Sequence, residues 1–320
     1  MRENMREPLL SVCLITYNHV KYIREAIEGV LMQKVNFSWE FIIADDCSTD
    51  GTREIVLEYK KKYPKFIKLI LQDKNVGPAK NWIDLITYPK SKYVAYFEGD
   101  DYWIDPLKLQ KQVDFLEEHP DYSICFHKVK ILKLGRLKKD NITKVPSETT
   151  TIEDLAKYGN YIHTISSIFK NKNYYNLGQF CVGDYPLHLI NAQTGKIKYI
   201  NKTMAVYRIH DNGIWSNKTQ NEKMKNWLGL LSSLIPIMHY EVKHLFIFQY
   251  INLFLNLYKS VTQETEKYLL LEYSISIFPE LNKDVLLAII ERDKYFSSDN
   301  HLITLIKDRI KSTLYDTPQN

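Results

Sequence analysis

Two groups of carboxylates stand directly after apolar runs of the sequence. The stretch YVAYFEGDDYW places Glu98, Asp100 and Asp101 within four residues, and the run FIIA is followed by Asp45 and Asp46. Either acidic group alone would be interpreted as a cap of a helix or turn. Ligands of open α/β sheets bind outside the carboxyl ends of the strands. Two acidic groups, each after an apolar run, therefore indicate one shared site.

Carboxylates held this close repel one another, so some of them must take up protons unless a cation neutralises them. Hard oxygen ligands suit Mg²⁺ or Mn²⁺. An ion held by only one or two carboxylates keeps positions open for the phosphate oxygens of a substrate. The acidic residues therefore predict a metal site that holds a diphosphate.

The elements that must position these residues alternate along the first third of the chain. Apolar runs at 9–15, 41–44, 66–72 and 93–97 predict buried strands, and helical patterns at 23–31, 53–63 and 78–86 separate them. This alternation predicts an α/β fold with a doubly wound, mostly parallel sheet. The first three strands also end in polar segments, TYNH, DDCSTDGT and QDKNVGPAKN.

Bulk composition narrows the class of protein. A chain of 320 residues suits two domains, and a net charge of +5 does not by itself imply nucleic acid, although it would suit phosphate-bearing ligands or an anionic membrane surface. The four cysteines form no C-x-x-C pair, and the N-terminal MRENMREPLL lacks the apolar core of a signal peptide. We therefore expect a cytoplasmic protein that could still touch the inner face of a membrane.

Seven segments together resemble glycosyltransferase family 2. SVCLITYN, IIADDCSTDGT, NVGPAKN and EGDDYW stand in the order and spacing of that family over roughly the first 120 residues, and HTISSIF, VGDYPLHL and YRIHDNGIWS extend the match more thinly. The resemblance implies a GT-A fold and inverting transfer of a sugar from a nucleotide donor.

The resemblance also implies roles for single residues. Thr16 and Asp46 would contact the nucleotide base, Asp100 and Asp101 would hold Mn²⁺ or Mg²⁺, and Asp184 would be the catalytic base. The remaining nucleotide-sugar residues would be Tyr17, Asn18, Asp45, Asn75, Gly77, Lys80, Glu98, Gly99, Arg208 and His210.

Several of these assignments leave an alternative open. Glu98 stands where the family's D-x-D motif has Asp, so its contact with the ribose or a metal-bound water is less defined. Lys80 could approach the diphosphate or remain solvated. Asp184 alone, before Tyr185-Pro186, would be a helix cap. Arg208 and His210 are candidates for phosphate or acceptor contacts, and His210 could be structural.

The second half of the chain is expected to contain an acceptor-binding part and a helical part. The predicted boundaries are 8–220 for the catalytic domain, with 8–120 binding the nucleotide sugar and 121–220 the acceptor, and 221–320 for a helical C-terminal subdomain. The basic stretch 128–144 predicts a solvated hairpin or loop rather than an anion site.

One strongly apolar helix is predicted over 244–260, with Gln249, Asn252 and Asn256 as its narrow polar stripe. Helical patterns at 285–290 and 302–310 could cover it within the chain. A homodimer and a peripheral membrane contact are the other two ways to bury this helix.

The predicted function is a metal-dependent inverting glycosyltransferase. It would move a sugar from a UDP-sugar donor to a hydroxyl of a glycan or lipid-linked acceptor. The product would belong to bacterial-type surface polysaccharide synthesis. A nucleotidyltransferase is the rival enzyme, and the lack of a Gly-rich basic phosphate loop argues against it. A degenerate GT-A scaffold is the rival without activity; only Glu98 supports it, and the intact Asp46, Asp100, Asp101 and Asp184 argue against it.

Overall fold

The structure is a computed structural model that describes residues 7–141, 143–172, 174, 183–210, 213 and 218–277. The chain divides into two compact units, Met1–Asn217 and Lys218–Asn320. The predicted helical patterns at 285–290 and 302–310 lie outside the described residues.

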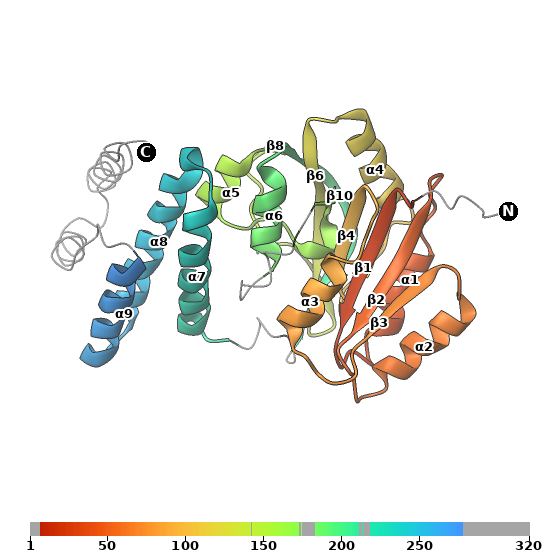
Figure 1. Cartoon of the computed structure of the whole chain (residues 1–320), viewed down its shortest axis with the longest axis horizontal. Coiled ribbons are helices and arrows are strands. Elements are labelled where there is room, and N and C mark those ends of the chain that lie inside the picture. Colours follow the sequence, from red (N-terminus) through yellow and green to blue (C-terminus); the bar gives the residue numbers. More distant parts are fainter. Residues whose placement is uncertain are drawn as a thin grey trace. The chain divides into compact units, whose positions relative to one another are not determined.

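One sheet of ten strands forms the centre of the first unit in the described part of the chain (Figure 1). Its order is β3-β2-β1-β4-β9-β6-β10-β5, with β7 beside β6 and β8 beside β10. The bounds are β1 Leu10–Thr16, β2 Trp39–Asp45, β3 Ile67–Leu71, β4 Tyr93–Glu98, β5 Tyr102–Trp103, β6 Tyr122–Lys133, β7 Arg136–Lys139, β8 Thr149–Thr150, β9 Ile168–Lys170 and β10 Lys196–Ile209.

The four predicted strands are confirmed as β1 to β4, and they are parallel. β1 pairs with β2 and β4, and β2 pairs with β3. Parallel strands need crossover connections, which the intervening helices supply. The sheet continues beyond β4 through the short β9, which is antiparallel to both β4 and β6. The fold is therefore the predicted doubly wound, mostly parallel α/β fold.

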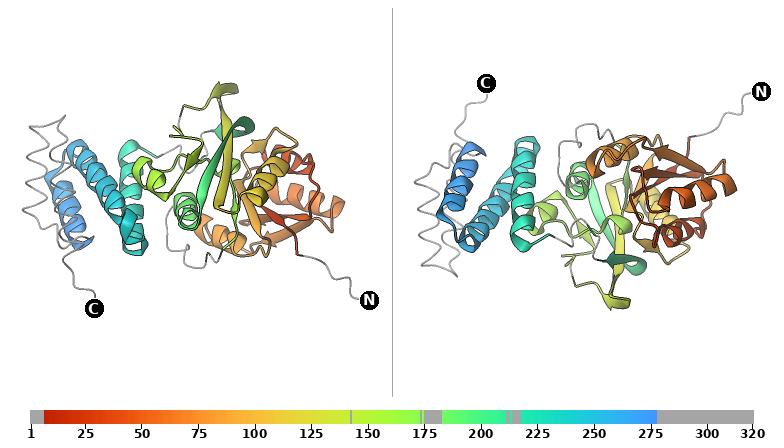
Figure 2. Two further views of the ribbon diagram at one scale, coloured as in Figure 1. Left: turned by 90° about the horizontal axis from the view of Figure 1, so that it is seen from above. Right: turned by 90° about the horizontal axis from the view of Figure 1, so that it is seen from below.

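Helices cover both faces of the parallel strands (Figures 1 and 2). Their bounds are α1 Ile23–Leu31, α2 Thr52–Lys62, α3 Pro78–Ile86, α4 Lys108–Glu118, α5 Ile152–Tyr158 and α6 Asp184–Ala192, with a 3₁₀ turn η1 at Thr164–Ser166. The main apolar cluster joins α1 and α2 to the face of β1 that carries Val12 and Leu14. Side chains alternate along a strand, so α3, whose Trp82 and Leu85 are buried outside that cluster, covers the opposite face.

The start of α4 differs from the sequence expectation. Asp105-Pro106 suggests a helix with Asp as N-cap and Pro as first residue, but the helix begins at Lys108. The carboxylate Oδ1 of Asp105 accepts a hydrogen bond from the backbone N–H of Leu107 at 2.9 Å, and Lys108 N–H donates to the Asp105 carbonyl at 3.1 Å. Asp105 therefore closes a turn that precedes the helix.

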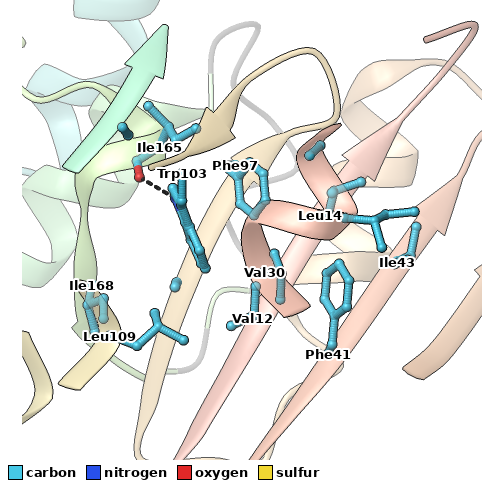
Figure 3. Close-up of a cluster of buried hydrophobic side chains, with 14 of the residues drawn as sticks. Val12, Leu14, Val30, Phe41, Ile43, Phe97, Trp103, Leu109, Ile165 and Ile168 are labelled. Carbon is cyan, nitrogen blue, oxygen red and sulfur yellow. Dashed lines mark hydrogen bonds between the residues drawn. The ribbon is translucent and has the colours of Figure 1, made fainter. Parts of the chain in front are cut away.

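The apolar core reaches from the parallel strands to the segment that follows the acidic motif (Figure 3). Val12 and Phe41 lie at one side of the cluster, and Trp103 lies at the other, buried against Phe97. The indole N–H of Trp103 donates to the Ile165 carbonyl at 3.0 Å. The chain that follows the carboxylates is thus anchored in the core and tied to η1.

The basic stretch forms the predicted hairpin. β6 and β7 pair antiparallel through a two-residue turn, Leu134-Gly135, in which both residues have positive φ, 50° and 70°. Two consecutive positive φ angles are typical of the turns that match the twist of a hairpin. All of β7 is exposed. The charges of this strand therefore face solvent.

Lys108 is buried in the core of the first unit. Its Nζ lies 4.2 Å from the centre of the Trp103 ring and has no hydrogen-bond partner among the described residues. Burial lowers the pKa of Lys108 to about 7. An unfolded lysine has a pKa of about 10. Between these pH values the folded protein binds fewer protons than the unfolded chain. Because of Lys108, the free energy of unfolding therefore decreases as the pH falls from about 10 to about 7.

We expect Lys108→Met to raise the free energy of unfolding at pH 7 by on the order of 2 kcal/mol, because an apolar chain of similar length replaces an unpaired buried amine. The measurement is urea unfolding at pH 7 and pH 10, where the gain should shrink because Lys108 of the unfolded chain begins to lose its proton. Lys61→Met, on the exposed face of α2, is the matched control. A less stable Lys108→Met at pH 7 would contradict the prediction.

The second unit is helical, as predicted. Its described elements are α7 Gln220–Leu234, a 3₁₀ turn at Ile235–Ile237, α8 Tyr240–Ser260 and α9 Glu264–Ile277. On α8, Asn252 and Asn256 are exposed and Gln249 is half-buried, whereas Phe246 and Phe254 are fully buried. No helix of the described residues is both long and apolar enough to span a membrane.

Candidate active site

The ends of β1, β2 and β4 meet at one edge of the sheet. In the strand register Thr16 lies opposite Asp45, and Ile15 lies opposite Glu98. Beyond these pairs the Asp46 N–H donates to the Thr16 carbonyl at 3.1 Å, and the Gly99 N–H donates to the Ile15 carbonyl at 2.8 Å. The segments that follow the three strands are therefore held side by side.

Asp46 joins the second strand end to the loop before α3. Its carboxylate, 2% exposed, accepts hydrogen bonds from the backbone N–H groups of Val76 at 2.7 Å and Gly77 at 3.0 Å. Gly77 has φ 86°, a conformation that favours glycine, and its N–H also lies 3.0 Å from Oδ1 of Asn75. Asp46, Asn75 and Gly77 therefore lie together, as the sequence analysis expects of a binding loop.

Asn18 joins the ends of β1 and β2 in the same way. It has φ 54°, its N–H donates to Ser48 Oγ at 2.9 Å, and its Oδ1 accepts from the Thr49 N–H at 2.9 Å. Tyr17 beside it is 42% exposed. The TYN segment thus presents an accessible aromatic ring above a fixed turn.

Asp45 and Lys80 each have an ion-pair partner within the protein. Nε of Arg53 lies 2.5 Å from Oδ2 of Asp45, and the same guanidinium donates to the Gln72 carbonyl at 2.7 Å. Lys80 forms an ion pair with Asp84 one helical turn later, with 59% of its side chain exposed. Both residues thus have a structural partner, although the sequence predicts that they lie close to the nucleotide.

Glu98 and Gly99 form the tightest part of the site. Glu98 accepts hydrogen bonds from the hydroxyls of Tyr96 at 3.2 Å and Thr164 at 2.8 Å. Burial, together with the charge of Asp100, raises the pKa of Glu98 to about 7. A Cβ on Gly99 would come within 3.0 Å of Thr16 Oγ1 and 3.1 Å of His19 Nδ1. Glycine at this position lets the turn approach β1.

Asp100, in the turn after β4, and His210, directly after β10, face each other although they are far apart in the sequence. Oδ2 of Asp100 lies 2.9 Å from Nε2 of His210, whose ring packs against Tyr22 at 4.8 Å between centroids. Burial alone would raise the pKa of Asp100, but the hydrogen bond with His210 and the charges of His19 and His210 lower it overall. Asp100 is therefore held as a carboxylate.

Asp101 is buried, contrary to the expectation that it lies at a solvent-facing strand end. It is 1% exposed, because the turn after β4 directs its side chain toward β10, where Oδ1 accepts from the backbone N–H of Arg208 at 2.7 Å. Oδ2 has no partner among the described residues. Burial and the neighbouring charges of Asp100 and Glu98 raise the pKa of Asp101 well above its usual range.

Arg208 connects the acidic turn to α1. Its guanidinium donates to the Asp100 carbonyl and to Glu25, the latter at 2.5 Å, and lies over the rings of Tyr22 and Tyr102 at 4.5 and 5.0 Å. The charge of Arg208 is thus already paired with Glu25, although the sequence made Arg208 a candidate for a phosphate contact.

Asp184 is the first residue of α6. The side-chain N–H of Asn160 donates to its Oδ2 at 2.8 Å. Burial raises the pKa of Asp184 above its usual value, against the opposing hydrogen bonds from backbone N–H groups and Asn160. The charge of Asp184 also acts on Glu98, which places the two carboxylates in one site.

The side-chain oxygen and nitrogen atoms of the acidic turn and of His210 are the candidate ligands of a divalent cation. In the described part of the chain no three His, Cys, Asp or Glu side chains are grouped as metal ligands. Two donor atoms, Asp100 Oδ2 and His210 Nε2, do lie together, and Asp101 Oδ2 is a buried oxygen without a described partner. Mg²⁺ and Mn²⁺ sites in phosphate-binding proteins commonly use one or two protein ligands and complete the shell with phosphate and water. The residues fit such an ion.

Sequence reasoning missed several residues of the site. Thr164 stands in HTISSIF and His19 in TYNH, so both motifs were noticed without a role for these side chains. Arg53 and Asn160 have no local signal, because each acts on a carboxylate of a different segment.

Comparisons with known proteins agree with this geometry. The family model described as glycosyl transferase family 2 matches residues 11–175. The uncharacterized protein Rv1520 of Mycobacterium tuberculosis strain H37Rv is 37% identical over 239 residues, 72% of this chain and 69% of that protein. The putative teichuronic acid biosynthesis glycosyltransferase TuaG of Bacillus subtilis is 31% identical over 228 residues, 69% of this chain and 86% of that protein.

Two solved structures show the same fold at low sequence identity. S. aureus TarS 1–349 in complex with UDP-GlcNAc has a TM-score of 0.65 and 17% identity, over 97% of this chain and 93% of that one. The mannosyltransferase PcManGT of Pyrobaculum calidifontis, in complex with GDP-Man and Mn²⁺, has a TM-score of 0.53 and 13% identity, over 92% and 89%. On the family match and the identity to these relatives, the chain belongs to glycosyl transferase family 2 and is a glycosyltransferase.

Proposed function

We propose that the protein is a metal-dependent, inverting glycosyltransferase that moves a sugar from a nucleotide donor, UDP-linked, to a hydroxyl of a glycan or lipid-linked acceptor. The observation that carries the proposal is the convergence of Asp46, Asp100 and Asp184 at one sheet edge. The name of TuaG, which refers to teichuronic acid biosynthesis, supports an acceptor in surface polysaccharide synthesis. The UDP-GlcNAc in the TarS complex supports a UDP-sugar donor.

The donor would occupy the ends of β1, β2 and β4. Thr16 and Asp46 would contact the base, with Tyr17 packing beside it. The support is the backbone bond between Asp46 and Thr16 and the bonds by which Asp46 holds the loop before α3. Glu98 would contact the ribose, and the two hydroxyls that fix its carboxylate at the end of β4 support this role. Its raised pKa makes it a hydrogen-bond donor for part of its population near neutral pH.

Asp100 and His210 would hold the divalent ion. Asp101 would support them through its hydrogen bond from the backbone N–H of Arg208. An imidazole ligand favours Mn²⁺ over Mg²⁺, which prefers oxygen. A bound divalent ion would neutralise the diphosphate as it leaves. Mn²⁺ in the PcManGT complex supports this choice.

Asp184 would act as the general base. A carboxylate that receives the proton of the acceptor hydroxyl makes that oxygen a better nucleophile. Attack on the anomeric carbon from the side opposite the leaving diphosphate inverts its configuration. The position of Asp184 at the start of α6, beside Glu98, is the support for this role.

The acceptor would bind over β6 and β10. A hollow of about 250 Å³ lies there, lined by the rings of Phe126, Tyr161 and Tyr199 and by His163. Aromatic faces with nearby polar groups suit a sugar ring. His163 also acts by its charge on Asp184, which supports an acceptor position on this side of the proposed base. We accordingly propose 8–120 as the donor part, 121–220 as the acceptor part and 221–320 as a separate helical subdomain.

The experiment that tests the function is a panel of nucleotide sugars with Mn²⁺ and with a chelator. We expect one donor to raise the melting temperature and to be hydrolysed slowly without an acceptor, both only with metal. Turnover that persists in chelator would remove the metal from the proposal. A panel in which no donor binds would overturn the donor assignment.

We further propose a cytoplasmic enzyme whose C-terminal helices are buried within their own unit. The hydroxyl of Tyr250 on α8 lies 3.0 Å from Oγ of Ser274 on α9, and Phe246 and Phe254 of α8 are fully buried. The full chain should run as a monomer in light scattering and stay in the supernatant with anionic vesicles. A dimer or a vesicle-bound protein would favour the alternative that it matches.

A further inference from the structure

Two hydrogen bonds join Asp184 to a buried histidine through one amide. Nδ2 of Asn160 donates to Oδ2 of Asp184 at 2.8 Å, and Oδ1 of Asn160 lies 3.0 Å from Nδ1 of His188. His188 is fully buried and stands one helical turn after Asp184 on α6. A carboxylate, an amide and an imidazole therefore stand in a row, with the carboxylate at the end that borders the site.

The direction of the row follows from hydrogen-bond chemistry. An ionised carboxylate only accepts, so Asn160 must turn its NH₂ group to Asp184. Its Oδ1 then faces His188 and the backbone N–H of Ile162, the latter at 3.4 Å. Because an amide oxygen only accepts, Nδ1 of His188 carries the proton. Nε2 of His188 is then the unprotonated nitrogen, and it is buried without a partner among the described residues.

We propose that Asn160 and His188 are positioning residues for Asp184: His188 fixes the orientation of the Asn160 amide, and the amide holds the carboxylate ionised and in place for the acceptor hydroxyl. The inference rests on the proposed function only in taking Asp184 as the base. The chain of hydrogen bonds exists whether or not that assignment is correct.

His188 suits this task because it does not change its charge. Burial lowers the pKa of His188 to about 3, so the ring stays neutral throughout the range in which an enzyme works. A neutral ring with a single N–H has one way to bond Asn160.

Asp184 needs such support because its burial opposes its charge. The titratable groups that act on it or respond to it come from β4, β10 and the segment before η1: Glu98, Tyr96, Tyr207 and His163. Among these groups only His163 favours the ionised form of Asp184, and the burial of Asp184 disfavours that form. The side-chain N–H of Asn160 adds to the backbone N–H groups of Tyr185 and Asp184 and to the charge of His163, which also favour the ionised form that a general base requires.

The first test is the pKa of Asp184, measured by NMR titration of aspartate ¹³Cγ in the full chain. Asn160→Ala should raise this pKa by about one unit, since a hydrogen bond to a charged group is lost. His188→Leu should raise it by less, and His188→Asn, which keeps an N–H near the position of Nδ1, should restore the wild-type value. Tyr185→Phe is the matched control: it removes the 2.7 Å hydrogen bond from the same helix to the Leu155 carbonyl and should leave the pKa unchanged.

The second test uses the unaltered protein. Long-range ¹H–¹⁵N spectra should show His188 protonated at Nδ1 and neutral down to pH 5.

An Nε2–H tautomer, or a pKa of Asp184 unmoved by Asn160→Ala, would overturn the proposal. A donor-hydrolysis profile whose acidic limb moves up by about one unit in Asn160→Ala would support it. If Asp184→Asn kept full turnover while the NMR results held, the base assignment would fail and the positioning chain would stand.

Discussion

Asp184→Asn is expected to lower the turnover of the nucleotide sugar by at least about a hundredfold while donor binding stays within a factor of two or so. The amide keeps the shape of the carboxylate and its contact with Asn160 but takes up no proton from an acceptor hydroxyl. The measurement is product formation together with calorimetric binding of the donor with Mn²⁺. Near-normal turnover would make Asp184 a structural cap of α6.

The stability of the same variant separates lost chemistry from lost folding. Burial raises the pKa of Asp184 above that of the unfolded chain, so the folded state binds more protons and loses stability as the pH rises through this range. The charge therefore costs stability at neutral pH. We expect Asp184→Asn to melt at the wild-type temperature or above it, and a lower melting temperature would mean that the lost activity reports misfolding.

Asp100→Ala should weaken metal-dependent binding of the nucleotide by at least about tenfold, since it removes one of the two protein donors that lie together. Calorimetry with Mn²⁺ and with chelator measures the effect. Asp114→Asn, a carboxylate on α4 bonded only to Gln110 in the described contacts, is the control and should bind as the wild type does. Equal affinity of Asp100→Ala in metal and in chelator would exclude the proposed ion site.

Asp101→Ala should behave differently from Asp100→Ala. Asp101 is buried and accepts from the backbone N–H of Arg208, so its removal leaves that N–H without its acceptor. We expect a loss of about 1–3 kcal/mol in the free energy of unfolding in addition to weaker binding. Comparing the melting temperatures of the two variants distinguishes the half-buried Asp100 from the fully buried Asp101.

The order of elements and the place of the site could be predicted from the sequence. Central parallel strands are buried on both faces, so they appear as unbroken apolar runs such as FIIA and YVAYF. Their carboxyl ends lie at one edge, so the polar residues after each run had to gather there. The position of Pro78 at the start of α3 follows equally from local chemistry, since proline suits the first turn of a helix.

The partner of each carboxylate was decided only by the tertiary structure. Asp45 is bonded by Arg53, Asp100 by His210, Asp101 by Arg208 and Asp184 by Asn160, and three of these pairs join segments that are far apart in the chain. A strand end places a side chain at the edge but does not choose its neighbour. That choice depends on the register of β10 against β6 and β5 and on the path of the loop before η1, which arise from packing over the whole sheet. For this reason the acidic pairs could be identified from the sequence, whereas the difference in burial between Asp101 and Asp100 could not.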